Sequence, residues 1–509
     1  MEYNNDIVYI ICINIPYRKI LYISSMIFLI SILNSINDNL TNIPELKYYT
    51  QQKLKLFVPK KIYNSICHKT IFFTSNYRNN SDITKYNIVE FINTKNSFVT
   101  YYLNDSVYLQ YPNLFASNGL IRSNNIYSDN NLIFCYRVIG YIIKNSSLFG
   151  LNKYQKIYRL LGSYQIFSKK SIYINYNEMN KKFNDDYNYM PDTYYYPQDK
   201  EFIDKKFMNY RLNLNDLWLV KPTNDYGGHG IKILESLIKI KQKQYMLSKY
   251  LTNLDLIKNK KYDLRLYVLI TGLKPLRIYF NKEGLVRISS KNFTLNKESI
   301  QDKFVHLTNT GVNEKNKNFI KPNNTENENA NIWNLYTYSK YLKKVNVDFQ
   351  NIRNKINDII IKSIISVYKN LTIEQSRHNL NDMNFYAILG YDIIITKDYQ
   401  PYLLEINEGP SMFYSNELER KIKNNLLADT LNLVGISIFS KNIIFKNRKN
   451  KMISVEEHVN DAICELSRPR GDYELIFPIK DNIKIYNKFF IDINNKENEL
   501  FWKIIDERF

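Results

Sequence analysis

The stretch that decides the fold runs from Ile388 to Met412 and reads ILGYDIIITKDYQPYLLEINEGPSM. Its two apolar runs, YDIII and PYLLEIN, flank the polar segment TKDYQ, which predicts two neighbouring strands joined by a turn. Asp392 lies in the first strand, while Glu405 and Asn407 lie two residues apart on the second and therefore share a face. Oxygen donors on adjacent strands are typical of Mg²⁺ sites, although acidic residues at strand ends can also be merely solvated. We predict that these three residues form a metal site.

A second candidate site lies upstream, where a buried strand is followed by a glycine-rich loop. The strand LWLV ends before Lys221, and PTNDYGGHGI follows, with Gly228 and Gly230 among its small residues. Such residues allow backbone N–H groups to approach an anion, and a nearby ammonium group neutralises phosphate charge. The segment is neither a Walker A motif nor a dinucleotide fingerprint, so taken alone it is a weak indication of phosphate binding.

Charged residues alternate along KYDLRLYVLI, which begins at Lys261 and is typical of a strand. Asp263 and Arg265 therefore share one face, where they either pair with each other or meet a ligand. The runs LRIYF and LVRISS flank NKEG, which predicts a hairpin turn ending at Gly284, with Arg287 on the returning strand. Further on, FVHLTN indicates only that a turn begins.

Composition limits the classes of protein to which the chain can belong. At 509 residues, 44% of them hydrophobic, the chain can build two or three packed units, and global disorder is excluded. Lys and Arg number 70 against 49 Asp and Glu, a net charge of 70 − 49 = +21, which favours nucleic acid, an anionic membrane or an acidic protein as partner. The abundant Tyr, Asn, Ile and Lys share A/T-rich codons, so codon bias is an alternative source of this charge. The four cysteines and five histidines lack the spacing of a disulfide framework or a zinc site.

Other segments mark the organisation of the chain. The apolar run Ile20–Leu33 follows Arg18 and Lys19 and is shorter than a membrane span, so a buried helix or strand and a signal or membrane anchor both stay open. The Asn-rich stretch 313–332 predicts a loop or mobile insert, and the spacing of Ile and Val predicts a helix near 351–369.

Six motifs in order make the chain resemble the tubulin–tyrosine ligase-like family: PDTYYYP, LWLVKPTNDYGGHGI, KYDLRLYVLI, PLRIYFNKEGLVRISS, HLTNTGVNEKN and the stretch ending in LLEINEGPSM. The resemblance covers roughly residues 105–440, and RPRGDYELIFP (Arg468–Pro478) is similar to a segment that follows the core in several members. It implies an α+β, ATP-grasp-like fold, in which the nucleotide is held between two α+β lobes and a smaller N-terminal domain is present. The implied domains are 1–104, poorly defined apart from the apolar segment near 20–33; 105–205, an N-terminal ligase subdomain; 206–300, a central ATP-grasp subdomain; 301–440, a C-terminal ATP-grasp subdomain with the Asn-rich insert; and 441–509, a C-terminal extension.

The resemblance also assigns roles to individual residues. Arg265 and Arg287 resemble arginines that face the carboxylates of the incoming amino acid and of the acceptor, and we treat them as the catalytic pair. The implied cofactors are ATP and Mg²⁺, and the metal ligands are again Asp392, Glu405 and Asn407. Residues that match the nucleotide-binding motifs of the family are Lys221, Gly228, Gly230, Lys249, Tyr250, Leu251, Lys261, Asp263, Thr308 and Asn309.

Three segments depart from the pattern of the family. The glycine loop, often RGRG or RGKG, reads GGHG at 227–230, so two positive charges near the phosphates are missing. Ser248 stands where the hinge often has a glutamine. The N-terminal NHFPG…RKD signature has its nearest counterpart in Gln110–Ser123, with Arg122 in place of its lysine.

These features predict an ATP-dependent carboxylate–amine ligase that adds glutamate to the acidic C-terminal tail of tubulin through an acyl-phosphate intermediate. HLTNTGVNEKN and IWNL are similar to motifs of the glutamate-adding, or polyglutamylase, branch. The open alternatives are a tubulin tyrosine or glycine ligase and a non-catalytic basic protein that binds tubulin or nucleic acid. The expected partners are the tails of tubulin or microtubules and free L-glutamate, with neither nucleic acid nor a membrane. The expected location is the cytoplasm, on the microtubule cytoskeleton, including a cilium or basal body.

Overall fold

The computed structural model describes residues 154–508, apart from 224–228, 242, 324–325, 378–381, 438–452 and 492–495, and short pieces between residues 70 and 134. The apolar run 20–33 and most of the predicted region 1–104 lie outside these residues. Apart from Arg508, everything described below belongs to one unit of the chain, 67–507. Among the described helices, none combines the length and the apolar character that crossing a membrane requires.

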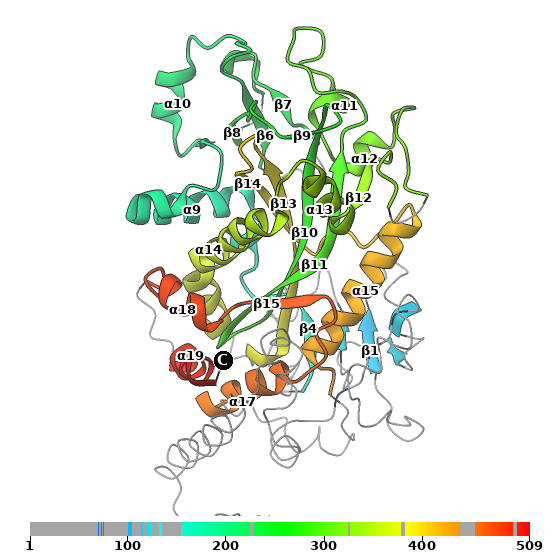
Figure 1. Ribbon diagram of the computed structural model, residues 1–509. Helices are drawn as coiled ribbons and strands as arrows, with labels where there is room; N and C mark the ends of the chain where they lie inside the picture. Colours follow the sequence, from blue (N-terminus) through cyan, green and yellow to red (C-terminus); the bar gives the residue numbers. More distant parts are fainter. Residues whose placement is uncertain are drawn as a thin grey trace, which may run out of the picture. The chain divides into compact units, whose positions relative to one another are not determined.

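A large mixed sheet forms the framework of this unit (Figure 1). Its strands are β1 (Thr100–Leu103), β2 (Ile121–Ser123), β3 (Leu132–Phe134), β4 (Lys156–Tyr158), β9 (Leu256–Ile257), β10 (Lys260–Leu273), β11 (Leu276–Ile288), β12 (Ile332–Asn334), β13 (Phe385–Ile395), β14 (Pro401–Glu408) and β15 (Tyr473–Phe477). The order is β12-β11-β10-β13-β4-β3-β1-β2, and β9, β14 and β15 pair with β10, β13 and β11. The pairs among β10, β11, β13 and β14 are antiparallel, whereas β1 to β4 pair in parallel. The predicted strand pair around TKDYQ is therefore confirmed as β13 and β14.

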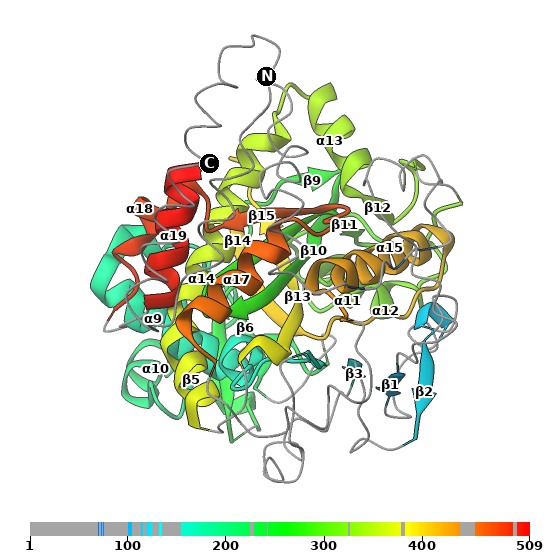
Figure 2. The same ribbon diagram turned by 90° about the horizontal axis from the view of Figure 1, so that it is seen from below.

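Helices cover both faces of this sheet because its central strands are apolar on both sides; all 11 residues of β13 are buried. On one face lies α14 (Phe349–Arg377), where Ser363 Oγ and the Tyr391 hydroxyl are 2.8 Å apart, and α14 confirms and extends the predicted helix. On the other face lies α15 (Glu417–Val434) (Figure 2). Its leucines join Tyr267 in a core cluster. The remaining described helices are α8 (Tyr164–Phe167), α9 (Lys169–Phe183), α10 (Lys200–Phe207), α11 (Lys303–His306), α12 (Thr310–Asn313), α13 (Leu335–Lys344), α17 (Val455–Leu466), α18 (Lys480–Asn487) and α19 (Lys496–Arg508).

The hairpin turn predicted at NKEG is wrong. β10 and β11 form one long hairpin that turns at residues 274–275, and NKEG lies inside β11. The ladder shifts register here and includes Leu266 opposite Gly284. A Cβ at residue 284 would come within 2.9 Å of the Arg265 carbonyl oxygen, so this glycine permits close contact between two strands rather than a turn.

A second, four-stranded sheet consists of β5 (Thr193–Tyr196), β6 (Trp218–Pro222), β7 (Lys232–Ile233) and β8 (Tyr245–Lys249), in the order β5-β8-β6-β7. Ile203 and Phe207 of α10 pack against Trp218 and Leu247 to form its core. Since β6 ends at a proline, which has no N–H to extend the ladder, Lys221 lies at the end of a strand, as predicted.

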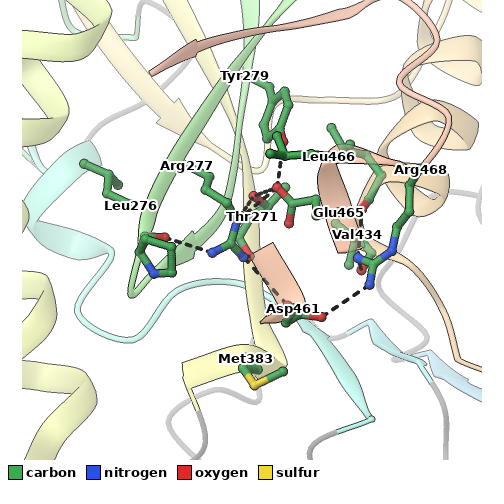
Figure 3. Close-up of polar contacts among 12 residues, drawn as sticks. Thr271, Leu276, Arg277, Tyr279, Met383, Val434, Asp461, Glu465, Leu466 and Arg468 are labelled. Atoms are coloured by element: carbon green, nitrogen blue, oxygen red, sulfur yellow. Dashed lines mark hydrogen bonds and ion pairs between the residues drawn. The ribbon is translucent and has the colours of Figure 1, made fainter. Parts of the chain in front are cut away.

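The C-terminal part joins the large sheet through β15 and through a buried network of charges (Figure 3). Arg277, at the tip of the β10–β11 hairpin, donates to Glu465 of α17 at 3.0 Å, and Glu465 also accepts from Tyr279 at 2.8 Å. Arg468 donates to Asp461 at 3.3 Å. Removing one partner of a buried ion pair costs about 3–5 kcal/mol, so this network fixes α17 to the hairpin.

The segment that follows α17 needs glycine at one position. Gly471 has a φ of +56°, and a Cβ there would lie within 2.1 Å of the Asp429 carboxyl group. The same carboxyl group accepts a hydrogen bond from the Asp472 N–H at 2.9 Å, which fixes the entry into β15.

Within α17, Cys464 is disulfide-bonded, which the cysteine spacing did not predict.

The Asn-rich stretch 313–332 is a loop between α12 and β12, and its asparagines fasten it to the end of β11. Asn313 Oδ1 accepts from the Ser290 N–H, and Asn331 Nδ2 donates to the Ser289 carbonyl, both at 2.8 Å. Both asparagine side chains are buried. The described part of this loop is therefore held to the sheet by side-chain hydrogen bonds rather than by an apolar contact alone.

Candidate active site

A cavity lies between the small sheet and the ends of β10, β13 and β14, and both sheets contribute side chains to it. It is lined by Lys169, Pro191, Leu219, Lys221, Ile231, Lys249, Tyr250, Leu251, Lys261, Asp263, Arg287, His306, Leu307, Thr308, Asn309, Asp392, Ile394, Leu404 and Glu405. Most of the residues predicted from the sequence therefore meet in one place. Four residues are exceptions. Arg265 and Asn407 do not line the cavity but contact residues that do. Gly230 is exposed and does not line it, and Gly228 lies outside the described residues.

The two predicted metal-binding carboxylates face each other on β13 and β14. Asp392 is opposite Glu405 in the ladder, and Asn407 Nδ2 donates to Glu405 Oε1 at 3.1 Å, which confirms that Glu405 and Asn407 share a face. Burial would raise the pKa of Asp392, but Arg265 and Arg287 outweigh this effect and hold the pKa well below its usual range. Burial, followed by the charge of Asp392, raises the pKa of Glu405. The site therefore contains one firmly ionised carboxylate and one whose charge is poorly compensated.

Charges of opposite sign alternate across three strands beside these carboxylates. Arg265 is opposite Asp392 in the β10–β13 ladder, and its Nε donates to Asp392 Oδ1 at 2.6 Å. Arg287 is opposite Asp263 in the β10–β11 ladder and donates to both of its carboxylate oxygens, with Nε to Oδ1 at 2.8 Å. An NH2 group of Arg287 also lies 2.9 Å from Asp392 Oδ2. Asp263 and Arg265 thus pair across strands and not with each other, because cross-strand neighbours are closer than residues two apart on one strand.

Two lysines give the cavity an excess of positive charge. Burial lowers the pKa of Lys221 to about 8, with Lys169 adding to the effect and Glu405 opposing it. Burial likewise lowers the pKa of Lys261 to about 8, with Asp263 opposing the shift and Lys221 adding to it. Among the described residues, Lys221 has no ion pair. An anion between these two ammonium groups would restore their usual pKa, so the cavity is suited to a polyanionic ligand.

The third predicted lysine does not share this role. Lys249 Nζ contacts the carboxyl group of Asp216 and lies 5.1 Å from the centroid of the Trp218 ring, at the surface of the small sheet. Its side chain is thus already paired, and Tyr250 and Leu251, which follow it in the chain, line the cavity with it.

The donor set fits a hard cation. The described residues contain no cluster of three or more His, Cys, Asp or Glu side chains arranged around a common point. Asp392 and Glu405 supply two carboxylates and Asn407 an amide oxygen, and Mg²⁺ commonly uses one or two carboxylates while keeping positions for water and phosphate. The raised pKa of Glu405 supports this fit, because a cation would compensate the repulsion that now disfavours its charge.

Lys169 and His306 line the cavity but were missed from the sequence. Lys169 begins α9, and its Nζ lies 3.9 Å from Glu405 Oε2. Ser168 caps this helix by accepting from the Ser171 N–H, so the Ser-Lys-Lys run before a helical pattern was the available signal. Arg122, which the sequence suggested as the counterpart of a lysine in the family, is exposed on β2 and does not line the cavity.

Comparison with known proteins agrees with this geometry. A sequence profile of the tubulin-tyrosine ligase family matches residues 149–444, more than half of the chain. The chain therefore has an α+β, ATP-grasp-like fold, and it belongs to the tubulin-tyrosine ligase family. The match begins at residue 149 and so excludes Gln110–Ser123, where the sequence placed the N-terminal signature.

Three similar proteins have names that describe enzymes acting on tubulin. The chain is 30% identical over 298 residues to the tubulin monoglutamylase TTLL4 of Homo sapiens, covering 58% of this chain and 25% of that protein. It is 29% identical over 375 residues to the tubulin polyglutamylase TTLL6 of Mus musculus, covering 69% and 44%. It is 30% identical over 359 residues to a probable beta-tubulin polyglutamylase of Tetrahymena thermophila, covering 65% and 30%. The alignments thus span between a quarter and a half of the length of these relatives.

Proposed function

We propose that the protein is an ATP-dependent ligase that adds glutamate to the acidic C-terminal tail of tubulin. The observation that carries the proposal is the juxtaposition of two lysines, the half-buried Lys221 and the buried Lys261, with a pair of facing carboxylates in one cavity. The two lysines are suited to bind a triphosphate, because an anion would compensate the positive charges that burial now disfavours. The two carboxylates are suited to bind the metal ion that accompanies the triphosphate. The names of the relatives, which are tubulin monoglutamylases and polyglutamylases, support glutamate and tubulin as the substrates.

Each part of the cavity has a task in such a reaction. Lys221 and Lys261 neutralise phosphate charge. Asp392, Glu405 and Asn407 would hold Mg²⁺, which would supply further positive charge for phosphoryl transfer. The acceptor carboxylate attacks the γ-phosphorus of ATP and displaces ADP, which gives an acyl phosphate. The amine of the incoming amino acid then attacks the acyl carbon, and inorganic phosphate and a proton are released as the amide bond forms. The chain supplies position and charge rather than a covalent nucleophile.

Arg265 and Arg287 have different tasks in the proposed reaction. Arg265 and Arg287 already bind Asp392 and Asp263, so a substrate carboxylate would compete for guanidinium groups that have internal partners. Arg287 lines the cavity, whereas Arg265 does not line it and contacts it only through Asp392. We therefore assign the contact with a substrate carboxylate to Arg287 and assign to Arg265 the task of orienting Asp392.

The experiment that tests the function is mass spectrometry of tubulin tails after incubation with the protein, ATP, Mg²⁺ and glutamate, glycine or tyrosine in separate reactions. We expect a mass increase by glutamate residues only. Addition of glycine or tyrosine alone would replace the proposed substrate, and no addition with any of the three would favour a non-catalytic, tubulin-binding protein.

Two variants make this assay specific to the cavity. Glu405→Gln is isosteric and should abolish the mass increase. Glu417→Gln, on the exposed first turn of α15 and outside the cavity, should leave the mass increase unchanged and so controls for the loss of one carboxylate.

The proposed substrate implies a location on cytoplasmic microtubules.

A further inference from the structure

Three buried polar side chains form a continuous chain of hydrogen bonds in the wall of the cavity. The Lys261 ammonium donates to the Tyr250 hydroxyl oxygen at 3.2 Å, and this hydroxyl lies 2.8 Å from His306 Nδ1. On the far side of the imidazole ring, His306 Nε2 lies 3.1 Å from the Ser299 carbonyl oxygen. All three side chains are buried, with exposed fractions of 4% for Tyr250, 6% for His306 and 8% for Lys261.

The chemistry of the two ends fixes the direction of every hydrogen bond. A carbonyl oxygen only accepts, so His306 Nε2 carries the proton and donates to Ser299. Burial, reinforced by the charge of Lys261, lowers the pKa of His306 to about 4, so the ring is neutral and Nδ1 is an acceptor. Nδ1 therefore accepts a hydrogen bond from the Tyr250 hydroxyl group. The lone pairs of the tyrosine oxygen then face the lysine, which needs an acceptor.

The same rings also restrict where the lysine can go. Lys261 Nζ lies 4.6 Å from the centroid of the Tyr250 ring, a cation–π distance. The edge-on contacts of His306 with Tyr250 and with Phe293, at 5.6 and 5.8 Å between centroids, hold the imidazole ring in place. The three partners come from different elements: Tyr250 follows β8, Lys261 is on β10, and His306 ends α11. Asp263, two residues along β10, is already bound by Arg287 and does not compete for the lysine.

We propose that Tyr250 and His306 are positioning residues that hold the Lys261 ammonium group at the cavity, where it receives the anionic group of the nucleotide. This inference rests on the proposed function for the identity of the anion only. Neither residue needs to touch the anion. Tyr250 acts as a polarised acceptor for the lysine, and His306 acts by holding the tyrosine hydroxyl in the orientation that makes it an acceptor.

The test removes one hydroxyl group and follows two readouts in the full chain. Tyr250→Phe keeps the ring and deletes only the hydroxyl group, which accepts from Lys261 and donates to His306. The matched control is Tyr262→Phe, since this buried hydroxyl is next to Lys261 in the chain but bonds Asp255 and Tyr338 outside the cavity. The first readout is the Kd of Mg-ATP by calorimetry. The second is the rate at which Lys261 is acylated by a small N-hydroxysuccinimide ester without nucleotide, measured by mass spectrometry against Lys221 in the same sample.

We expect Tyr250→Phe to raise the Kd by roughly three- to tenfold. This is less than the full effect of a hydrogen bond to a charged group, because the Tyr250 hydroxyl bonds the lysine and not the nucleotide. Without its acceptor the ammonium form is disfavoured, so acylation of Lys261 should rise by about the same factor while that of Lys221 stays constant. His306→Phe, which keeps the aromatic contacts, should shift both readouts in the same direction, and Tyr262→Phe neither.

Unchanged Lys261 acylation in both Tyr250→Phe and His306→Phe would overturn the positioning role, whatever the ligand is. An unmodified protein that binds no Mg-ATP would instead refute the proposed function, and the acylation rates would still decide whether the two residues position Lys261. Equal Kd values for the unmodified protein and Tyr250→Phe, with both binding Mg-ATP, would overturn the inference and leave the proposed function intact.

Discussion

Replacing Asp392 by Asn and Glu405 by Gln perturbs two carboxylates that face each other but have different surroundings. Asp392 accepts from Arg265 at 2.6 and 3.1 Å and lies 2.9 Å from an NH2 group of Arg287, all in a buried setting. Asn at this position leaves two guanidinium groups with one remaining carboxylate, and breaking a buried ion pair in this way costs about 3–5 kcal/mol of the free energy of unfolding. Glu405→Gln removes a charge that burial and Asp392 already disfavour, so this variant should be as stable as the unmodified protein or more stable.

The stability of each variant relative to the unmodified protein should depend on pH, with opposite signs for the two variants. The folded-state pKa of Asp392 is lowered, so its contribution is present above the unfolded pKa of about 4 and is lost as pH falls; the deficit of Asp392→Asn should shrink in acid. The folded-state pKa of Glu405 is raised, so the charge costs stability as pH rises above its usual value, and Glu405→Gln should gain most at neutral and alkaline pH.

Urea denaturation at several pH values, with and without Mg-ATP, measures both effects. A ligand at 100 times its Kd adds about 2.7 kcal/mol to the unmodified protein, and the Mg²⁺-dependent part of this gain should be lost in Glu405→Gln. The reasoning would be refuted if Glu405→Gln were destabilised as strongly as Asp392→Asn, or if it kept the full Mg²⁺-dependent gain.

Three further outcomes are expected. Binding of the protein to microtubules should weaken steeply from low to physiological ionic strength, where the Debye length is about 8 Å, if the charge of +21 attracts acidic tails; a co-sedimentation assay that shows no salt dependence would instead favour codon bias as its origin. Burial, with Asp472 adding to it, raises the pKa of Glu283 to about 7, so stability is lost as pH rises from about 4.5 through 7. Glu283→Gln should therefore be about 3 kcal/mol more stable than the unmodified protein at pH 8 and no more stable at pH 4; equal thermal shifts at both pH values would contradict this. Gly471→Ala places a Cβ against the Asp429 carboxyl group at a positive φ and should cost at least about 1–3 kcal/mol in thermal unfolding, whereas a neutral effect would show that β15 does not depend on this contact.

The sequence predicted those parts of the site that depend on local periodicity. Asp392, Glu405 and Asn407 lie where a period of two in apolar strands places them, and Lys221 lies before the proline that ends its strand. NKEG failed as a turn because pairing to the neighbouring strands on both sides outweighed its turn-forming residues. The placement of Lys169 and the partners of the arginines depend on which strands become neighbours, and no local pattern specifies that.

The same limit explains what was missed at the C-terminus and around Lys261. Glu465 and Arg277 are 188 residues apart in the chain, and Tyr250 and His306 are 56 apart, so neither contact leaves a periodic signal. A resemblance to a known family located the lysines and carboxylates, but not the neutral side chains that orient them.

The pairing of β15 with β11 has a consequence for synthesis of the chain. Ile278 of β11 can pair with Phe477 of β15 only after Phe477 has left the ribosome. The ion pair between Arg277 and Glu465 also forms late in synthesis. Until then the nascent chain holds part of a long strand with an unpaired edge and an arginine that lacks its counter-charge. Exposed edges of this kind promote association between chains, so emerging polypeptides should need chaperone protection over this interval. A product that stops after α15 should accumulate as aggregate, even though it contains every residue that lines the cavity.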